Sequence, residues 1–107
     1  MITIEDFSKV ELRVGTILEA EKVPEGDRLL KLMIDFGEEK RQIMASIATF
    51  YPDPSILVGK QVTACVNLEP RKLMGYESQG MLVATDNEEG IVFIVPEKEV
   101  KNGAKIH

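Results

Sequence analysis

The sequence predicts an all-β protein that closes into a single small barrel, and three observations support this fold class. Apolar and polar residues alternate with a period of two along most of the chain, which is typical of strands with one buried face. One segment with helix signals interrupts the alternation, between the third and fourth predicted strands. A chain of 107 residues buries roughly two-thirds of its unfolded surface, so we expect residues 1–107 to form one domain.

The first predicted strand covers residues 10–20 and contains a bulge or bend. Its apolar face consists of Val10, Leu12, Val14, Leu18 and Ala20. Gly15 and the off-pattern Ile17 lie in the middle, where a bulge would let one long strand serve two parts of a barrel. The segment 23–27, which contains Pro and Gly, ends the strand.

The second and third strands are predicted to form a hairpin around a turn at residues 37–39. The inward residues are Leu30, Leu32, Ile34 and Phe36 on strand two, and Arg41, Ile43, Ala45 and Ile47 on strand three. The outward residues of the pair are Lys31, Met33, Lys40, Gln42, Met44 and Ser46. This combination suits phosphates and unstacked bases, and a plain solvated strand face is the alternative for each residue alone.

Residues 51–59 break the alternation and predict one or two helical turns. Asp53 or Ser55 provides a cap, a proline lies near the start, and Gly59 provides a stop. A fifth strand is expected at residues 81–85, after a fourth whose inward residues are Val62, Ala64, Val66 and Leu68. Three strands, a short helix and two more strands are the order of a five-stranded Greek-key barrel of the oligonucleotide-binding (OB) type.

Residues 86–107 form a predicted C-terminal extension. A polar turn at residues 86–90 precedes a run that is apolar at every position, namely Ile91, Val92, Phe93, Ile94 and Val95. Such a run needs cover on both faces. Two interpretations stay open: an additional core strand beneath the tail residues 101–107, or a homodimer interface.

The charge distribution limits how the chain can bind a polyanion. The net charge is −5, which is unfavourable for gripping nucleic acid by bulk electrostatics. Residues 28–72 nevertheless contain seven basic and five acidic side chains, a local balance of +2, so the remainder carries −7. A modest basic face in an acidic protein predicts weak, shape-dependent and salt-sensitive anion binding.

Catalytic, metal and cofactor motifs are not found in the sequence. The one histidine, His107, is the last residue, and the one cysteine, Cys65, lies in an apolar run where we expect it to be a core residue. No glycine pattern of a phosphate-binding or dinucleotide-binding loop is present. No apolar stretch approaches a membrane span, and the acidic N-terminus is unlike a targeting signal, which predicts a cytoplasmic protein. We therefore expect a binding module that is not an enzyme and needs no metal or cofactor.

The densest set of candidate contact residues lies in the run 67–81, which reads NLEPRKLMGYESQGM. Arg71 and Lys72 can contact phosphates, Asn67 and Ser78 can reach base edges or ribose hydroxyls, and Tyr76 and Met81 can stack on bases. With the strand face added, the predicted RNA-binding residues are Lys31, Lys40, Gln42, Asn67, Arg71, Lys72, Tyr76, Ser78 and Met81. Structural alternatives stay open, in which Asn67 caps the loop while Leu73 and Met74 plug the barrel end.

Four segments resemble the tRNA-binding domain family: FSKVELRVG at 7–15, DRLLKL at 27–32, EKRQI at 39–43 and the whole run 67–81. The resemblance implies an OB barrel whose C-terminal extension forms homodimers, and tRNA recognition by overall shape. It implicates Lys31, Asn67, Arg71, Lys72, Ser78 and Met81 in tRNA contact, and Ile91 to Val95 with the tail in dimerisation. The segment 23–27 departs from the family pattern, in which a histidine usually precedes the proline.

The family includes several kinds of protein, so more than one function stays open. The leading hypothesis is a non-catalytic, dimeric tRNA-binding module, either free-standing or an appendix of methionyl-tRNA synthetase. A second is a chaperone-like dimer that binds peptides through Met33, Met44, Leu73 and Met81. A third is a scaffold that only docks on or dimerises an aminoacyl-tRNA synthetase.

Overall fold

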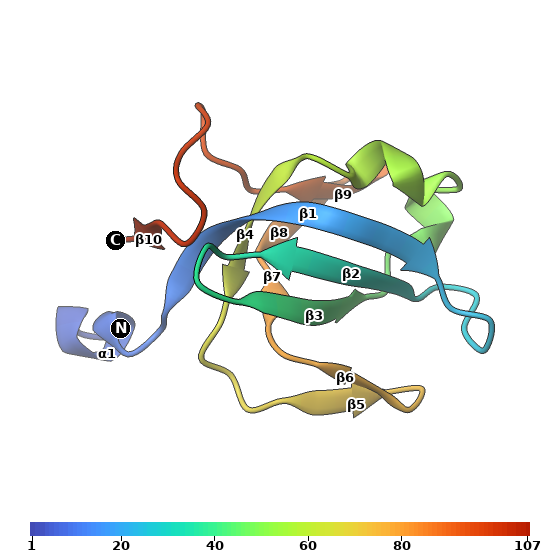
Figure 1. Cartoon of the computed structure of the whole chain (residues 1–107). Coiled ribbons are helices and arrows are strands. Elements are labelled where there is room, and N and C mark those ends of the chain that lie inside the picture. Colours follow the sequence, from blue (N-terminus) through green and yellow to red (C-terminus); the bar gives the residue numbers. More distant parts are fainter.

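The computed structural model describes all residues 1–107 and contains a β barrel with two additional hairpins (Figure 1). The main sheet has the strand order β3-β2-β1-β4-β7, with β10 also paired to β1. Its strands are β1 (Leu12–Lys22), β2 (Leu30–Asp35), β3 (Lys40–Ala45), β4 (Gln61–Cys65), β7 (Met81–Leu82) and β10 (Lys105–Ile106). The hairpins are β5 (Arg71–Leu73) with β6 (Tyr76–Ser78), and β8 (Ala84–Asn87) with β9 (Gly90–Phe93). The predicted five-stranded barrel is confirmed.

Strand β1 serves two parts of the barrel because it bends at a bulge. Its first half pairs with β4 and its second half with β2, and the register shifts between Ile17 and Glu19. Ile17 is fully buried whereas Leu18 is exposed, so the bulge reverses the alternation beyond Ile17. The prediction that Leu18 faces inward was therefore wrong, as was that for Val10, which is exposed and precedes the strand.

The barrel interior is filled by the alternating apolar residues of β2, β3 and β4. Leu30, Leu32, Ile34, Ile43 and Ala64 are each 0% exposed, as their period-two pattern predicts. The free Cys65 is buried, in agreement with the predicted core role. Leu68 is exposed because β4 ends at Cys65, and the inward placement predicted for Leu68 was wrong.

The predicted helical interruption consists of two short 3₁₀ helices, Ala48–Phe50 and Pro54–Leu57. The Asp53 carboxylate caps the second by accepting bonds from the Ser55 N–H at 3.1 Å and the Ser55 hydroxyl at 2.6 Å. These bonds lower the pKa of Asp53, the hydroxyl bond contributing most. A further helix, α1 (Ile4–Ser8), was not predicted, although the Thr3–Asp6 spacing forms a capping box. None of the helices has the length and apolar character that crossing a membrane requires.

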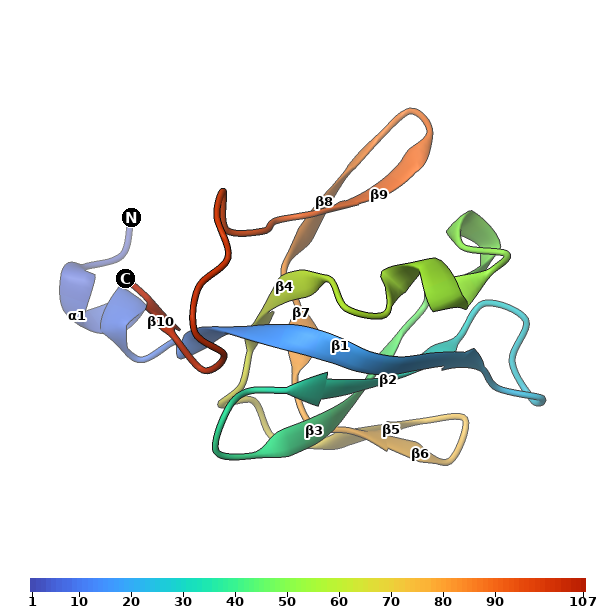
Figure 2. The same cartoon turned by 45° about the horizontal axis from the view of Figure 1, so that its top comes forward.

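The predicted fifth strand at 81–85 is interrupted at Val83, where the chain leaves the barrel. The Val83 N–H donates to the Thr63 carbonyl at 2.9 Å, while its own carbonyl accepts from the Ile94 N–H at 3.2 Å. The chain between these contacts forms the β8–β9 hairpin, which extends away from the barrel on the side opposite β5–β6 (Figure 2).

The two faces of the β8–β9 hairpin and the residues after it are unequally covered. Phe93 is half-buried and stacks on Tyr51, with ring centroids 5.8 Å apart and planes inclined by 13°. Val92, Ile94 and Val95 are exposed. The run 91–95 thus covers the barrel core with one face and presents an apolar surface with the other.

Candidate nucleic-acid interface

The run 67–81 contains a hairpin rather than an open loop. Leu73 pairs with Tyr76 across a two-residue turn at Met74 and Gly75. Both turn residues have positive φ, 53° and 86°, which is the conformation of a type I′ turn. Glycine adopts it readily, whereas Met74 is unusual there and hides the turn signal in the sequence. Alternation on either side of a two-residue, glycine-containing turn could have predicted this hairpin.

The hairpin covers the outer face of β2 and β3. Leu73 and Tyr76 pack against a second, smaller apolar cluster formed by Val23, Leu29 and Met44. Met44 faces outward, as its alternation predicts, yet it is only 5% exposed because the hairpin lies over it. The predicted open face of methionines and cations is therefore partly closed.

Ser78 and Gln79 join the hairpin to the free edge of β3, which lies opposite β7 without a regular ladder. The Met44 N–H donates to the Ser78 hydroxyl oxygen at 3.0 Å, and that hydroxyl donates to the Gly80 carbonyl at 3.0 Å. The Gln42 N–H donates to the Gln79 side-chain oxygen at 3.2 Å, and the Gln79 N–H donates to the Gln42 carbonyl at 2.8 Å. These bonds satisfy edge groups that a neighbouring strand would otherwise satisfy.

The hydrogen bonds at this seam account for two of the predicted contact residues. Ser78 is 1% exposed and its hydroxyl both donates and accepts within the protein. The Gln42 side-chain amide donates to the Glu77 carbonyl at 2.9 Å, which ties β3 to the hairpin. Both side chains therefore attach the β5–β6 hairpin to β3.

Asn67 anchors the N-terminal segment to the start of the run. Its side-chain oxygen accepts the Glu11 N–H at 2.9 Å, and its amide nitrogen donates to the Lys9 carbonyl at 2.6 Å. This arrangement favours the structural alternative for Asn67, because its donor and its acceptor both have backbone partners within the chain.

The cations of the candidate interface differ in how far they are engaged. Arg71, Lys72 and Lys40 are exposed and make no ion pair. Lys31 is half-buried, pairs with Glu21 at 2.7 Å and lies 6.0 Å from the centre of the Tyr76 ring. Its hydrogen bond to Glu21 is the largest cause that raises the pKa of Lys31. Among the predicted contact cations, Arg71, Lys72 and Lys40 are therefore free to meet an anionic ligand.

The tip of the hairpin contacts the loop between β1 and β2. The Tyr76 hydroxyl donates to the Glu25 carboxylate at 2.9 Å, and this bond is the main reason that the pKa of Tyr76 is raised. A Cβ added to Gly26 would lie 3.7 Å from the Met74 side chain. The exposed Arg28 belongs to the same loop and was not among the predicted contacts. Its place in a rim loop of an OB barrel is the signal that could have identified it.

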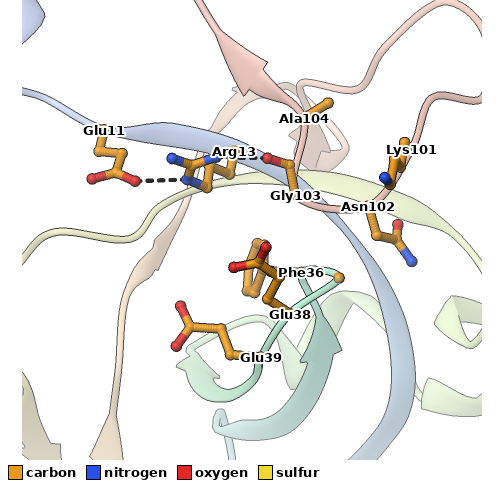
Figure 3. A pocket seen from close by; sticks show the side chains of 10 residues that line it. Glu11, Arg13, Phe36, Glu38, Glu39, Lys101, Asn102, Gly103 and Ala104 are labelled. Atoms are coloured by element: carbon orange, nitrogen blue, oxygen red, sulfur yellow. Dashed lines mark hydrogen bonds and ion pairs between the residues drawn. The ribbon is translucent and has the colours of Figure 1, made fainter.

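The remaining predicted residue, Met81, is 49% exposed at the start of β7, next to the seam. No three His, Cys, Asp or Glu side chains converge in a way that could hold a metal ion. A separate pocket of about 1050 Å³ lies between the C-terminal tail and the β2–β3 turn (Figure 3). Arg13 bridges Glu11 and the Gly103 carbonyl at its edge, and none of the nine predicted RNA-binding residues lines it.

Comparison with protein families matches residues 12–105 to the model described as "Putative tRNA binding domain". Among curated proteins, the methionine–tRNA ligases of Caldanaerobacter subterraneus subsp. tengcongensis and of Thermotoga maritima are each 52% identical over 105 residues. Each match covers 98% of this chain and 16% of the ligase. The chain thus spans about one-sixth of the length of these relatives.

Two solved structures match the chain over nearly their whole length. A MetRS-related protein from Pyrococcus horikoshii is 39% identical, with a TM-score of 0.91 and coverage of 100% of this chain and 98% of that one. The chaperone CsaA from Bacillus anthracis is 35% identical, with a TM-score of 0.88 and coverage of 100% and 99%. The same fold is therefore used both in a protein related to a synthetase and in a chaperone.

Proposed function

Because the chain belongs to the tRNA-binding domain family, we propose that it binds folded tRNA through the β5–β6 hairpin and the surfaces beside it, without chemistry of its own. The observation that carries this proposal is the pair Arg71 and Lys72, exposed and unpaired on a hairpin that is docked to the barrel along its length. Cations on a hairpin whose backbone is already fixed can meet phosphates without the cost of ordering a loop on binding.

The footprint extends from the hairpin to its neighbours. Lys40 on β3 and Arg28 on the β1–β2 loop add unpaired positive charge on either side. Tyr76, Lys31 and Met81 offer partly exposed surface for stacking or phosphate contact. We assign Ser78, Gln42 and Asn67 to holding this surface in place, since their polar groups already bond within the chain. With a net charge of −5, a single copy has a modest footprint, and a second subunit would enlarge it.

We further propose that the exposed apolar face of residues 91–95 is the core of a homodimer interface. Val92, Ile94 and Val95 are 40%, 46% and 52% exposed, and adjacent exposed apolar residues are typical of subunit contacts. A symmetric dimer would carry two β5–β6 hairpins, one on each subunit.

The protein acts in translation under this proposal, either as a free-standing factor or as the appendix of a methionyl-tRNA synthetase. The 52% identity to the two ligases supports the second context, and the 39% identity to the MetRS-related protein supports the first. In both contexts the module supplies tRNA affinity to a catalytic body elsewhere, and the expected location is the cytoplasm.

A filter-binding titration with folded tRNA tests the proposal. We expect an affinity that falls as salt rises, with a slope set by the number of phosphates contacted, and similar affinity for several tRNA species. Salt-independent or absent binding would overturn the proposal, and sedimentation of the same samples reports the oligomeric state.

Peptide binding is the second candidate function, because the CsaA chaperone matches the chain along its full length. The peptide surface predicted from the sequence is reduced, since Met44 is buried under the hairpin and Leu73 packs against it. Competition between tRNA and an unfolded peptide distinguishes the two functions. Peptide binding with no tRNA binding would favour this alternative, and co-purification with a synthetase without RNA would favour a scaffold.

A further inference from the structure

One side chain of β3 holds both ends of the segment that carries the candidate tRNA contacts. Arg41 projects its guanidinium towards the seam between β3 and the β4–β7 side of the barrel. One terminal nitrogen, Nη1, donates to the Val66 carbonyl and, at 3.1 Å, to the Gln79 carbonyl. Val66 immediately precedes the run 67–81, and Gln79 lies two residues before its end.

Glu39 holds the other side of the same guanidinium. Its carboxylate accepts from the Arg41 Nε at 2.8 Å and lies 2.8 Å from Nη2. The Arg41 side chain is only 24% exposed. The planar fork of arginine can make these bonds in fixed directions, whereas a lysine ammonium has a single nitrogen that cannot span them.

We propose that Arg41 is a positioning residue for tRNA binding, which fixes the β5–β6 hairpin relative to the barrel without contacting RNA itself. The inference rests on the proposed function. It adds Arg41 to the residues that support tRNA binding, and the guanidinium of Arg41 already bonds within the chain. Arg41 bonds to the carbonyls of Val66 and Gln79, at the two ends of the run 67–81. Its loss lets the β5–β6 hairpin pivot on the barrel, while the hydrogen bonds between β5 and β6 remain. Arg71 and Lys72 then lose their common geometry.

The Arg41→Lys variant tests this role because it keeps the charge and removes the fork. We expect tRNA affinity to fall about tenfold, which corresponds to the loss of one charge-assisted hydrogen-bond set. Adding Arg71→Ala and Lys72→Ala should then cost less than it does in the wild type, because the contacts are already impaired. Wild-type affinity in Arg41→Lys would overturn the proposal, because any cation would then suffice.

Two glutamate variants separate positioning from simple electrostatics. Glu39→Ala removes a negative charge beside the candidate interface, so charge alone predicts tighter tRNA binding, whereas loss of the support for Arg41 predicts weaker binding. Glu38→Ala is the matched control, since Glu38 is exposed and makes no ion pair or side-chain hydrogen bond. We expect Glu38→Ala to bind as well as the wild type or better. Tighter binding in both variants would contradict the proposal.

Hydrogen exchange on the free protein tests, independently of tRNA, whether Arg41 fixes the run 67–81 through its bonds to Val66 and Gln79. In Arg41→Lys, the Gln79 amide at the seam should exchange faster, while the amides of β1 and β2 stay protected. Unchanged exchange of the Gln79 amide would overturn the positioning role of Arg41 even if tRNA binding fell. If the wild type binds no tRNA but the Gln79 amide exchanges faster in Arg41→Lys, the proposed function is overturned. The structural role of Arg41 is then still supported.

Discussion

The two hairpins outside the barrel sheet have the same architecture and opposite chemistry. The β5–β6 hairpin presents Arg71 and Lys72 to solvent and is joined to β3 through buried polar groups such as Ser78. The β8–β9 hairpin presents Val92 and is joined to the barrel by an aromatic stack that includes Phe93. Each hairpin uses one face for attachment, so the other face determines what it can bind. The proposed ligands differ accordingly: a polyanion for the first hairpin and an apolar surface for the second.

The apolar face of residues 91–95, which begins on the β8–β9 hairpin, gives the largest expected effect. Val92→Asp places an unpaired carboxylate in the proposed dimer interface twice, once from each subunit. We expect a cost of about 4 kcal/mol, roughly a thousandfold in the dimer dissociation constant. Sedimentation measures this as a fall to monomer mass. Asn87→Asp adds the same charge at the tip of that hairpin and should leave the mass unchanged. A dimer that persists in Val92→Asp would remove the assigned role of this face.

The cationic hairpin comes second. The double variant Arg71→Ala, Lys72→Ala should lose about 3 kcal/mol of tRNA binding, roughly a hundredfold. The slope of log affinity against log salt should fall by about 2, one for each phosphate contact. Lys98→Ala with Lys101→Ala removes the same charge from the exposed tail and should change the affinity far less. Equal losses in the two double variants would show that net charge, and not the hairpin, governs binding.

The attachment of the β8–β9 hairpin to the barrel gives an intermediate effect. Phe93→Ala removes the ring that stacks on Tyr51 and covers part of the core. We expect the free energy of unfolding to fall by about 2 kcal/mol, because the side chain is half-buried. Urea unfolding measures the change. Ile56→Ala removes an exposed apolar side chain and should stay within about 0.5 kcal/mol of the wild type. Equal effects would mean that the stack does not secure the hairpin.

The smallest effect concerns the tip of the cationic hairpin. The bond from Tyr76 to Glu25 raises the pKa of the Tyr76 phenol. The stabilisation of the folded state by this bond is therefore fully present below the pKa that Tyr76 has in the unfolded chain. It is lost as pH rises through the raised folded pKa. An ultraviolet titration should show the pKa of Tyr76 falling towards its usual range in Glu25→Gln. An unchanged titration would mean that the tip is not held by this bond.

Much of the barrel could be predicted because strand signals are local. The alternation of Leu30, Leu32 and Ile34 needs only neighbouring residues to read, and each of these side chains is fully buried as predicted. The inward placement predicted for Leu18 was wrong because a bulge shifts the alternation by one residue. The position of this shift depends on pairing with β2. The β5–β6 turn was missed because Met74 adopts a positive φ that its residue type disfavours.

The sequence by itself determined the barrel, its short helical interruption and the segments that carry cations and apolar residues. Only the tertiary structure decided which polar side chains remain available to a ligand. Ser78 bonds to a residue 34 positions away and Asn67 to one 56 positions away, so their partners are absent from any local pattern. Ser78 is buried, so its hydroxyl must be satisfied within the protein, whereas the exposed Asn67 uses its side-chain amide to bond the backbone of the N-terminal segment. Arg71 and Lys72 remain free because the hairpin leaves them without protein partners.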